Sequence, residues 1–111
     1  MASAIVTLPA TIKRGEIVTV RALIQHPMET GYRRDSSGTL LARDLIRRFE
    51  CHLNDGTTRT RVFSADLHAA IAANPLIAFA LRIDMDCTLE FQWSGDNGFA
   101  QKETRKVVLA T

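Results

Sequence analysis

The chain has few cysteines, few aromatic residues and no long apolar run. Only two of its 111 residues are cysteine, and aromatic residues make up 6%. Cys51 and Cys87 lack the CxxC spacing of redox and zinc motifs, so we expect two buried thiols, with a disulfide only in an oxidising compartment. No segment approaches the roughly 20 apolar residues that a membrane-spanning helix needs. The sequence therefore predicts neither a disulfide scaffold nor a transmembrane protein.

Catalytic and ligand-binding motifs are also absent from the sequence. It contains no GxSxG, no HExxH, no phosphate-binding glycine loop and no calcium-binding loop. His26, His52 and His68 are too far apart in sequence to lie on one structural element as metal ligands. We therefore predict no catalytic residue, no metal site and no cofactor.

Neither sign of charge dominates, and the formal net charge of +2 does not indicate a nucleic-acid or membrane partner. The basic side chains do cluster in one part of the sequence. The arginines of this cluster are Arg33, Arg34, Arg43, Arg47, Arg48, Arg59 and Arg61. We interpret them as a solvated face with local ion pairs; a docking patch for an acidic protein is the alternative. No aromatic residues alternate with them as a nucleic-acid stacking platform requires.

Alternation of apolar and polar residues predicts half-buried strands along most of the chain. The pattern is clearest in Cys87–Trp93, where every second side chain is apolar. Other strands are predicted near residues 5–8, 16–25, 45–53, 57–63, 77–83 and 102–109. The predicted inward positions include Leu45, Phe49, Cys51, Leu53, Ile77, Phe79, Leu81 and Ile83.

Turn-forming residues separate these strands where hairpins require them. Asn54-Asp55-Gly56 and Asp96-Asn97-Gly98 readily adopt the positive φ of tight turns. The alanine-rich segment 65–73 is predicted to be a short helix or a crossover loop, because alanine favours helix and the following Asn74-Pro75 ends it. The pattern predicts one all-β domain over residues 1–111, an immunoglobulin-like β-sandwich of about seven strands.

The segment from residue 26 to residue 35 departs from the strand pattern and is our leading candidate for a binding site. Pro27 ends sheet pairing, and Gly31 can adopt a φ that other residues avoid. Binding residues commonly lie on loops held by a rigid scaffold, although a purely connective loop is the alternative. The predicted partner-binding residues are His26, Met28, Glu29, Thr30, Gly31, Arg33 and Arg34.

The same segment resembles the signature of a known family. His26-Pro27-Met28-Glu29-Thr30-Gly31, followed by Arg33 and Gly38, is similar to the motif of the SoxZ family of the bacterial sulfur-oxidation system. Two further matches are Asn74-Pro75-Leu76 before Ala78-Phe79, and Trp93 before Asp96-Asn97-Gly98. The resemblance runs from about residue 15 to residue 108. The chain departs from the family pattern at Ala42 and Asp44, where the pattern has proline and histidine.

The resemblance implies a subunit that is not itself an enzyme. Members of the family pair with SoxY as a heterodimer, and SoxY holds the sulfur on a cysteine of its flexible C-terminal arm. Through this complex the chain would meet the other Sox enzymes. The resemblance also implies a periplasmic location, reached together with a signal-bearing partner, because residues 1–6 lack a signal-peptide pattern. We expect the apolar outer positions Ile17, Leu23 and Ile46 to contribute to the SoxY interface.

Two other functions, one structural and one enzymatic, are also compatible with the sequence. The chain is alternatively a homodimeric structural or interaction module, because the immunoglobulin-like sandwich hosts many functions. It is alternatively a thiol-dependent enzyme that uses Cys51 or Cys87. The predicted inward positions of both thiols argue against the second alternative, because buried thiols are unreactive.

Overall fold

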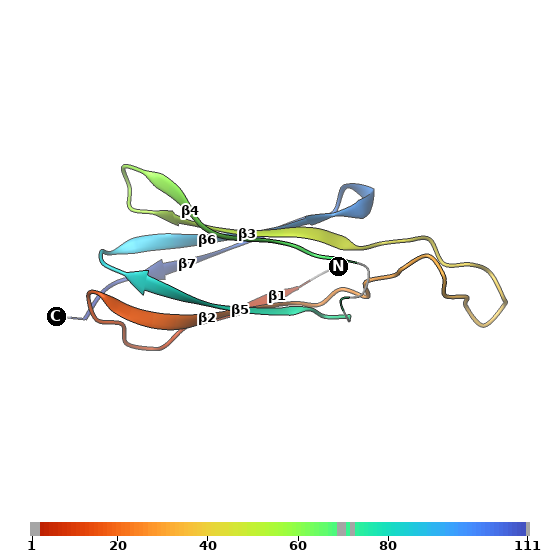
Figure 1. Ribbon diagram of the computed structural model, residues 1–111, viewed down its shortest axis with the longest axis horizontal. Helices are drawn as coiled ribbons and strands as arrows, with labels where there is room; N and C mark the ends of the chain where they lie inside the picture. Colours follow the sequence, from red (N-terminus) through yellow and green to blue (C-terminus); the bar gives the residue numbers. More distant parts are fainter. Residues whose placement is uncertain (1–2, 69–70, 72, 111) are drawn as a thin grey trace.

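Seven strands form two antiparallel sheets that pack face to face (Figure 1). The computed structural model describes residues 3–68, 71 and 73–110. One sheet has the order β1 (Ala4–Thr7), β2 (Glu16–Ile24) and β5 (Leu76–Ile83). The other has the order β4 (Arg59–Asp66), β3 (Ile46–Asn54), β6 (Cys87–Gly95) and β7 (Ala100–Val107). This architecture confirms the predicted immunoglobulin-like β-sandwich.

The core lies between the sheets and is formed by every second residue of the strands. The predicted inward stripe of β6 is buried in full: Cys87, Leu89, Phe91 and Trp93. Phe49 of β3 occupies the centre, with its ring centroid 5.1 Å from that of Trp93 and 6.2 Å from that of Phe79. Such aromatic pairs add about 0.5–1.5 kcal/mol beyond their buried area. The two sheets therefore meet through Phe49.

The orientation of one side chain, that of Ile46, was predicted wrongly. Ile46 was assigned to the outer face, but its side chain is completely buried. The pairing of β3 with β6 shifts register between Ile46 and Arg48, which breaks the strict alternation. The strands approach so closely here that a Cβ on Gly95 would lie 2.2 Å from the carbonyl oxygen of Leu45. Ile46 therefore cannot contribute to an outer interface.

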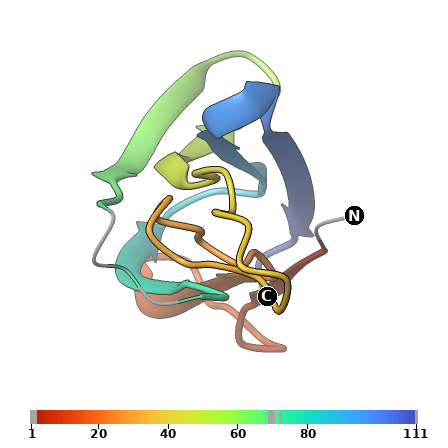
Figure 2. The same cartoon turned by 90° about the vertical axis from the view of Figure 1, so that its right-hand side faces the viewer.

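Different contacts join the two sheets along the two long sides of the sandwich. Figure 2 shows β1 and β7 together on one side, and β4 and β5 (green and teal) on the other. The first side is joined by the Ala110 N–H, which donates to the Ile12 carbonyl at 2.8 Å. On the second side the rings of Phe63 and Phe79 stack with centroids 4.3 Å apart.

The chain crosses between the sheets along the alanine-rich segment. Ala65 and Asp66 extend β4, and Leu67 donates a backbone hydrogen bond to the Arg47 carbonyl at 2.8 Å. Residues 69, 70 and 72 lie outside the described residues. Residues 65 and 66 were thus predicted wrongly, because they pair with Phe49 and Arg48 of β3 and belong to a strand. The remaining described residues of the segment form a crossover loop, which was one of the two predicted forms. No helix in the described ranges is long and apolar enough to cross a membrane.

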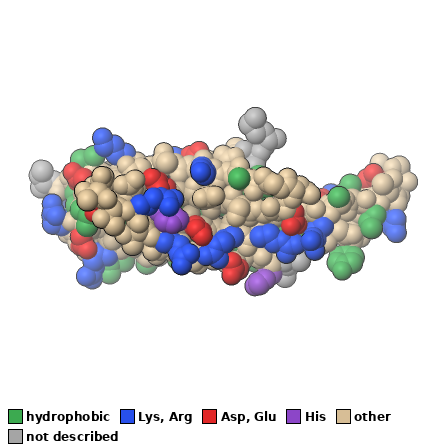
Figure 3. Space-filling model, turned by 90° about the horizontal axis from the view of Figure 1, so that it is seen from above, with side chains coloured by type: hydrophobic (Ala, Val, Ile, Leu, Met, Phe, Trp, Pro, Cys, Tyr) green, Lys and Arg blue, Asp and Glu red, His purple; other side chains and the backbone are tan. Residues whose placement is uncertain are grey.

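Basic and acidic side chains lie close together on the outward face of the four-stranded sheet (Figure 3). The arginines of the sequence cluster largely pair with carboxylates that lie nearby. These pairs are Arg33 with Glu29, Arg43 and Arg47 with Asp96, Arg48 with Glu50 and Asp66, Arg59 with Glu90, and Arg61 with Glu50. Arg34 instead donates to the Gly38 carbonyl. The predicted local ion pairs are therefore present.

We predict that Phe49→Ala lowers the free energy of unfolding by about 3–5 kcal/mol, because it removes the ring on which the two sheets meet. The matched control is Ile17→Ala on the outer face of β2, which should change the free energy of unfolding by less than about 0.5 kcal/mol. Urea denaturation followed by the fluorescence of the single tryptophan, Trp93, measures both. Equal losses in the two variants would contradict the packing described above.

Candidate partner-binding loop

Residues 25–45 join β2 to β3 and extend beyond the end of both sheets (Figure 1). We call this segment the binding loop. Its two limbs are paired by antiparallel bridges between Glu29 and Asp44 and between Arg34 and Leu40. The binding loop is thus an ordered double-stranded projection that lies at one end of a molecule 59 Å long.

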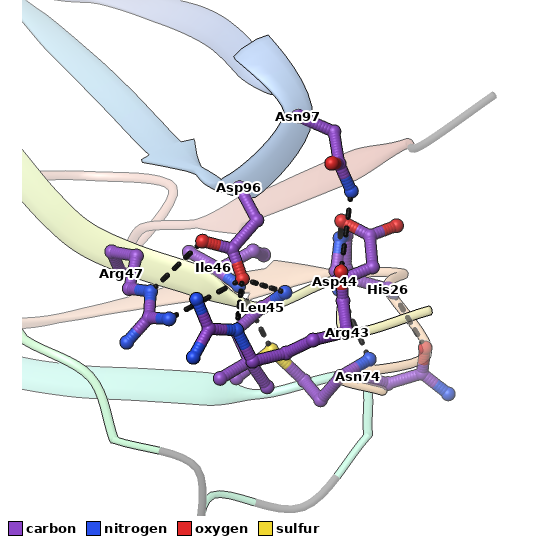
Figure 4. Close-up of polar contacts among 10 residues, drawn as sticks. His26, Arg43, Asp44, Leu45, Ile46, Arg47, Asn74, Asp96 and Asn97 are labelled. Atoms are coloured by element: carbon purple, nitrogen blue, oxygen red, sulfur yellow. Dashed lines mark hydrogen bonds and ion pairs between the residues drawn. The ribbon is translucent and has the colours of Figure 1, made fainter. Parts of the chain in front are cut away.

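His26 fixes the first limb of the binding loop to the crossover between β4 and β5. Its backbone N–H donates to the Asn74 side-chain oxygen at 2.9 Å, and its carbonyl accepts from the Asn74 N–H at 2.7 Å (Figure 4). Asn74 adopts a φ of 53°, a conformation that asparagine tolerates better than most residues. The Asn74-Pro75 motif of the sequence therefore holds the base of the loop.

The His26 side chain is buried, with only 4% of its surface exposed. Its Nδ1 accepts a hydrogen bond from the Met28 N–H at 3.1 Å, so the neutral ring holds its proton on Nε2. Nε2 lies 3.5 Å from Oδ1 of Asp44 (Figure 4). The ring packs edge-on against Phe99. No group of three or more potential metal ligands occurs among the described residues.

Met28 ties the same limb to β3. Its side chain is buried, and its sulfur accepts a hydrogen bond from the Ile46 N–H at 3.3 Å. Its φ of 55° is unfavourable for a residue with a side chain and persists only where the surroundings fix it. Met28 and His26 thus support the binding loop from inside, which places two of the predicted partner-binding side chains away from the surface.

Glu29, Thr30 and Gly31 shape the bend that follows. The Glu29 carboxylate accepts from the Arg33 guanidinium, and this hydrogen bond lowers the pKa of Glu29. The Thr30 hydroxyl accepts from the Tyr32 N–H at 3.4 Å. Gly31 has a φ of 93°, a conformation that favours glycine and that brings the chain sharply round.

The outer part of the binding loop exposes its side chains. Tyr32 is 89% exposed, and both Arg33 and Arg34 lie on the surface. The tip is ordered by Asp35, whose Oδ1 accepts from the Ser37 hydroxyl and from two backbone N–H groups. These hydrogen bonds lower the pKa of Asp35, and the bond from the Ser37 hydroxyl has the largest effect. Tyr32 was not among the predicted site residues, although it is more exposed than Leu40, the other large hydrophobic side chain exposed on the loop.

Asp96 fixes the second limb and was not predicted to do so. Its carboxylate accepts from the Leu45 N–H at 3.1 Å and from Nε of Arg47 at 3.1 Å (Figure 4). The Arg43 guanidinium lies 3.4 Å away. The bond from Arg47 lowers the pKa of Asp96, and Arg43 adds to the effect. The sequence resemblance marked Asp96, but only the fold brings it to these arginines.

The two thiols lie away from the binding loop. Cys51 and Cys87 are both free and buried. Burial raises the pKa of Cys51 to about 12 and also raises that of Cys87. A thiol in this state is protonated at neutral pH and is a poor nucleophile.

We predict that Asp96→Asn destabilises the domain more at about pH 7 than at about pH 2.5. The pKa of Asp96 is lowered in the folded state. The ionised carboxylate therefore stabilises the fold at a pH above the usual pKa of an aspartate, and this stabilisation is lost as the pH falls through the lowered pKa. Thermal unfolding across this pH range provides the measurement. The control is Asp84→Asn, because the Asp84 carboxylate accepts no hydrogen bond in the part of the chain that the structure describes. A pH-independent difference between wild type and Asp96→Asn would contradict this prediction.

We predict that neither cysteine reacts with a thiol-specific alkylating reagent at about pH 8 while the domain is folded, and that both react in denaturant. Mass spectrometry of the alkylated protein counts the modified sites. Rapid labelling of Cys51 or Cys87 in the folded protein would contradict the burial described above and would restore the thiol-enzyme alternative.

The fold is similar to those of several solved proteins, which include superoxide reductases and a sulfur carrier protein. Superoxide reductase (neelaredoxin) from Ignicoccus hospitalis matches with a TM-score of 0.74 and 12% identity, over 97% of this chain and 80% of that chain. Superoxide reductase from Nanoarchaeum equitans matches with a TM-score of 0.68 and 12% identity, over 95% and 91%. The sulfur carrier protein SoxY from Chlorobium limicola f thiosulfatophilum matches with a TM-score of 0.65 and 13% identity, over 98% and 80%. At these identities the likeness shows the fold alone.

Sequence comparison identifies the family. No curated protein sequence matches the chain at a significant level. The family model of the sulphur oxidation protein SoxZ matches residues 6–106, which include the binding loop, Asn74-Pro75 and the turn at Asp96. The chain belongs to the SoxZ family.

Proposed function

We propose that this chain is the non-catalytic subunit of a sulfur-carrier complex. It binds SoxY and helps to present the sulfur-loaded cysteine arm of SoxY to the thiosulfate-oxidising Sox enzymes. The observation that carries the proposal is the match of the SoxZ family model to residues 6–106. We place this complex in the periplasm, where the chain arrives bound to its signal-bearing partner.

The thiols of the chain support a division of labour with SoxY. Cys51 and Cys87 are buried and free, and burial raises the pKa of both. Neither is suited to pick up and release sulfur in turnover, because the thiolate is the reactive form. The proposal therefore assigns the covalent sulfur chemistry to the SoxY cysteine and assigns binding and presentation to this chain.

The binding loop is the proposed contact with the enzymes that process the sulfur. It is ordered before any partner binds, since both limbs are hydrogen-bonded to the sandwich through His26 and Asp96. A loop that is already ordered loses less entropy on association. Tyrosine and arginine dominate the energetics of protein interfaces, and Tyr32, Arg33 and Arg34 are adjacent and exposed at the surface of the loop. The buried His26 and Met28 would act by holding these residues in place.

We predict that purified chain forms a stable complex with SoxY, and that the triple variant Tyr32→Ala, Arg33→Ala and Arg34→Ala weakens the docking of this complex on a Sox enzyme by about tenfold or more. The sandwich of the triple variant should fold normally, since all three side chains are exposed and lie outside the core. Titration of the complex against each enzyme measures the affinity.

The matched control for these substitutions is Thr57→Ala in the β3–β4 turn, which lies at the opposite end of the molecule (Figure 1). The control should leave all affinities unchanged. Normal docking of the triple variant on every enzyme would remove the binding loop from the proposal. A chain that forms a stable homodimer and does not bind SoxY would contradict the proposed function as a whole.

A further inference from the structure

The outward faces of the two sheets have opposite chemistry. On the four-stranded sheet the outward side chains are polar or charged along every strand (Figure 3). They include Arg48, Glu50, His52, Glu90, Gln92, Lys102, Thr104 and Lys106. On the three-stranded sheet most outward side chains are apolar: Ile5, Ile17, Leu23, Leu76, Ala78 and Ala80. We call this second surface the apolar sheet face.

The strand register brings the apolar side chains of this face together. Ile5 pairs with Leu23, and Leu23 pairs with Leu76, so these residues form one row across all three strands. Ile5 and Leu76 are 53% and 58% exposed. The row continues into a shallow groove lined by residues that include Ile71, Ala73 and Leu76. A contiguous apolar surface of this kind marks an interaction site, whereas scattered exposed apolar residues do not.

The small side chains of the apolar sheet face favour another sheet as its partner. Ala78 and Ala80 lie side by side with Arg21 and Thr19 of β2, and both alanines are exposed. Small side chains at the centre of a strand allow a second layer to approach to the usual distance of about 10 Å between packed sheets. The partner surface is therefore expected to be a β-sheet face with large apolar residues opposite the alanines.

The charged side chains on the apolar sheet face indicate the charge of its partner. Its only charged outward side chains within the three strands are Arg21 and Arg82, and both are exposed. Neither forms an ion pair with any residue in the described ranges. A second copy of this chain would bring the same two positive charges to the contact, and like charges across an interface are costly. A partner with carboxylates opposite Arg21 and Arg82 fits this face better than a second copy does.

We propose that the apolar sheet face is the surface that binds SoxY, through a sheet face of SoxY with an apolar centre and acidic residues opposite Arg21 and Arg82. This inference rests on the proposed function. SoxY has the same fold as this chain, so it offers sheet faces of matching shape. The binding loop projects beyond the end of the sheets, so it stays free for other partners while SoxY occupies the face (Figure 1).

Two substitutions on the apolar sheet face and two matched controls test this inference. Ala80→Arg adds bulk and a third positive charge at the centre of the face, and Arg21→Glu reverses a charge that the partner is expected to meet. Thr104→Arg and Lys102→Glu introduce the same changes on the outward face of the four-stranded sheet. All four positions are exposed, so the variants should keep the thermal stability of the wild type. Isothermal titration with purified SoxY gives the affinities.

We expect Ala80→Arg and Arg21→Glu each to weaken SoxY binding by about tenfold or more, and the two controls to stay within about twofold of the wild type. If Ala80→Arg does not fold, Arg21→Glu alone decides. Wild-type binding that all variants retain would overturn this inference but leave the proposed function intact. A wild-type homodimer that Ala80→Arg dissociates would show that a second copy, and not SoxY, occupies the face. Failure of the wild type to bind SoxY would instead contradict the proposed function.

Discussion

The attachment of the binding loop to the sandwich is the constraint on which the proposed contacts depend. A connection of this length without secondary structure of its own would normally be mobile. Here the first limb is hydrogen-bonded to Asn74 through His26, and the second limb is hydrogen-bonded to Asp96 through Leu45. Asn74 lies on the crossover between the sheets and Asp96 on the turn between β6 and β7. The position of Tyr32 and its neighbours is therefore set by residues far away in the sequence.

The sandwich also determines which surfaces remain for partners. Alternate residues of the strands fill its interior around Phe49. The side chains that point outward are therefore the ones that can contact solvent or a partner. On the four-stranded sheet several of these side chains form ion pairs with one another, such as Arg59 with Glu90. On the three-stranded sheet the apolar row from Ile5 to Leu76 lies uncovered beside Arg21. One fold thus presents a solvated face, an apolar face and a projecting loop.

Local patterns in the sequence predicted the strands and turns, because period-two alternation and glycine turns act over a few residues. The assignment of Ile46 failed because its burial depends on a register shift opposite Gly95, which alternation within one strand does not reveal. The motif resemblance located the binding loop and Asn74. It did not show that His26 and Met28 are buried or that Asp96 binds Arg47, because both follow from contacts between distant segments.

The central claim is that this chain supplies binding while the sulfur is held on the cysteine of SoxY. The most direct measurement is mass spectrometry of the assembled complex after it has been loaded with thiosulfate by the Sox enzymes. The account predicts a sulfur adduct on the SoxY cysteine alone and unmodified Cys51 and Cys87. An adduct on either of these two cysteines that forms and disappears during turnover would contradict it.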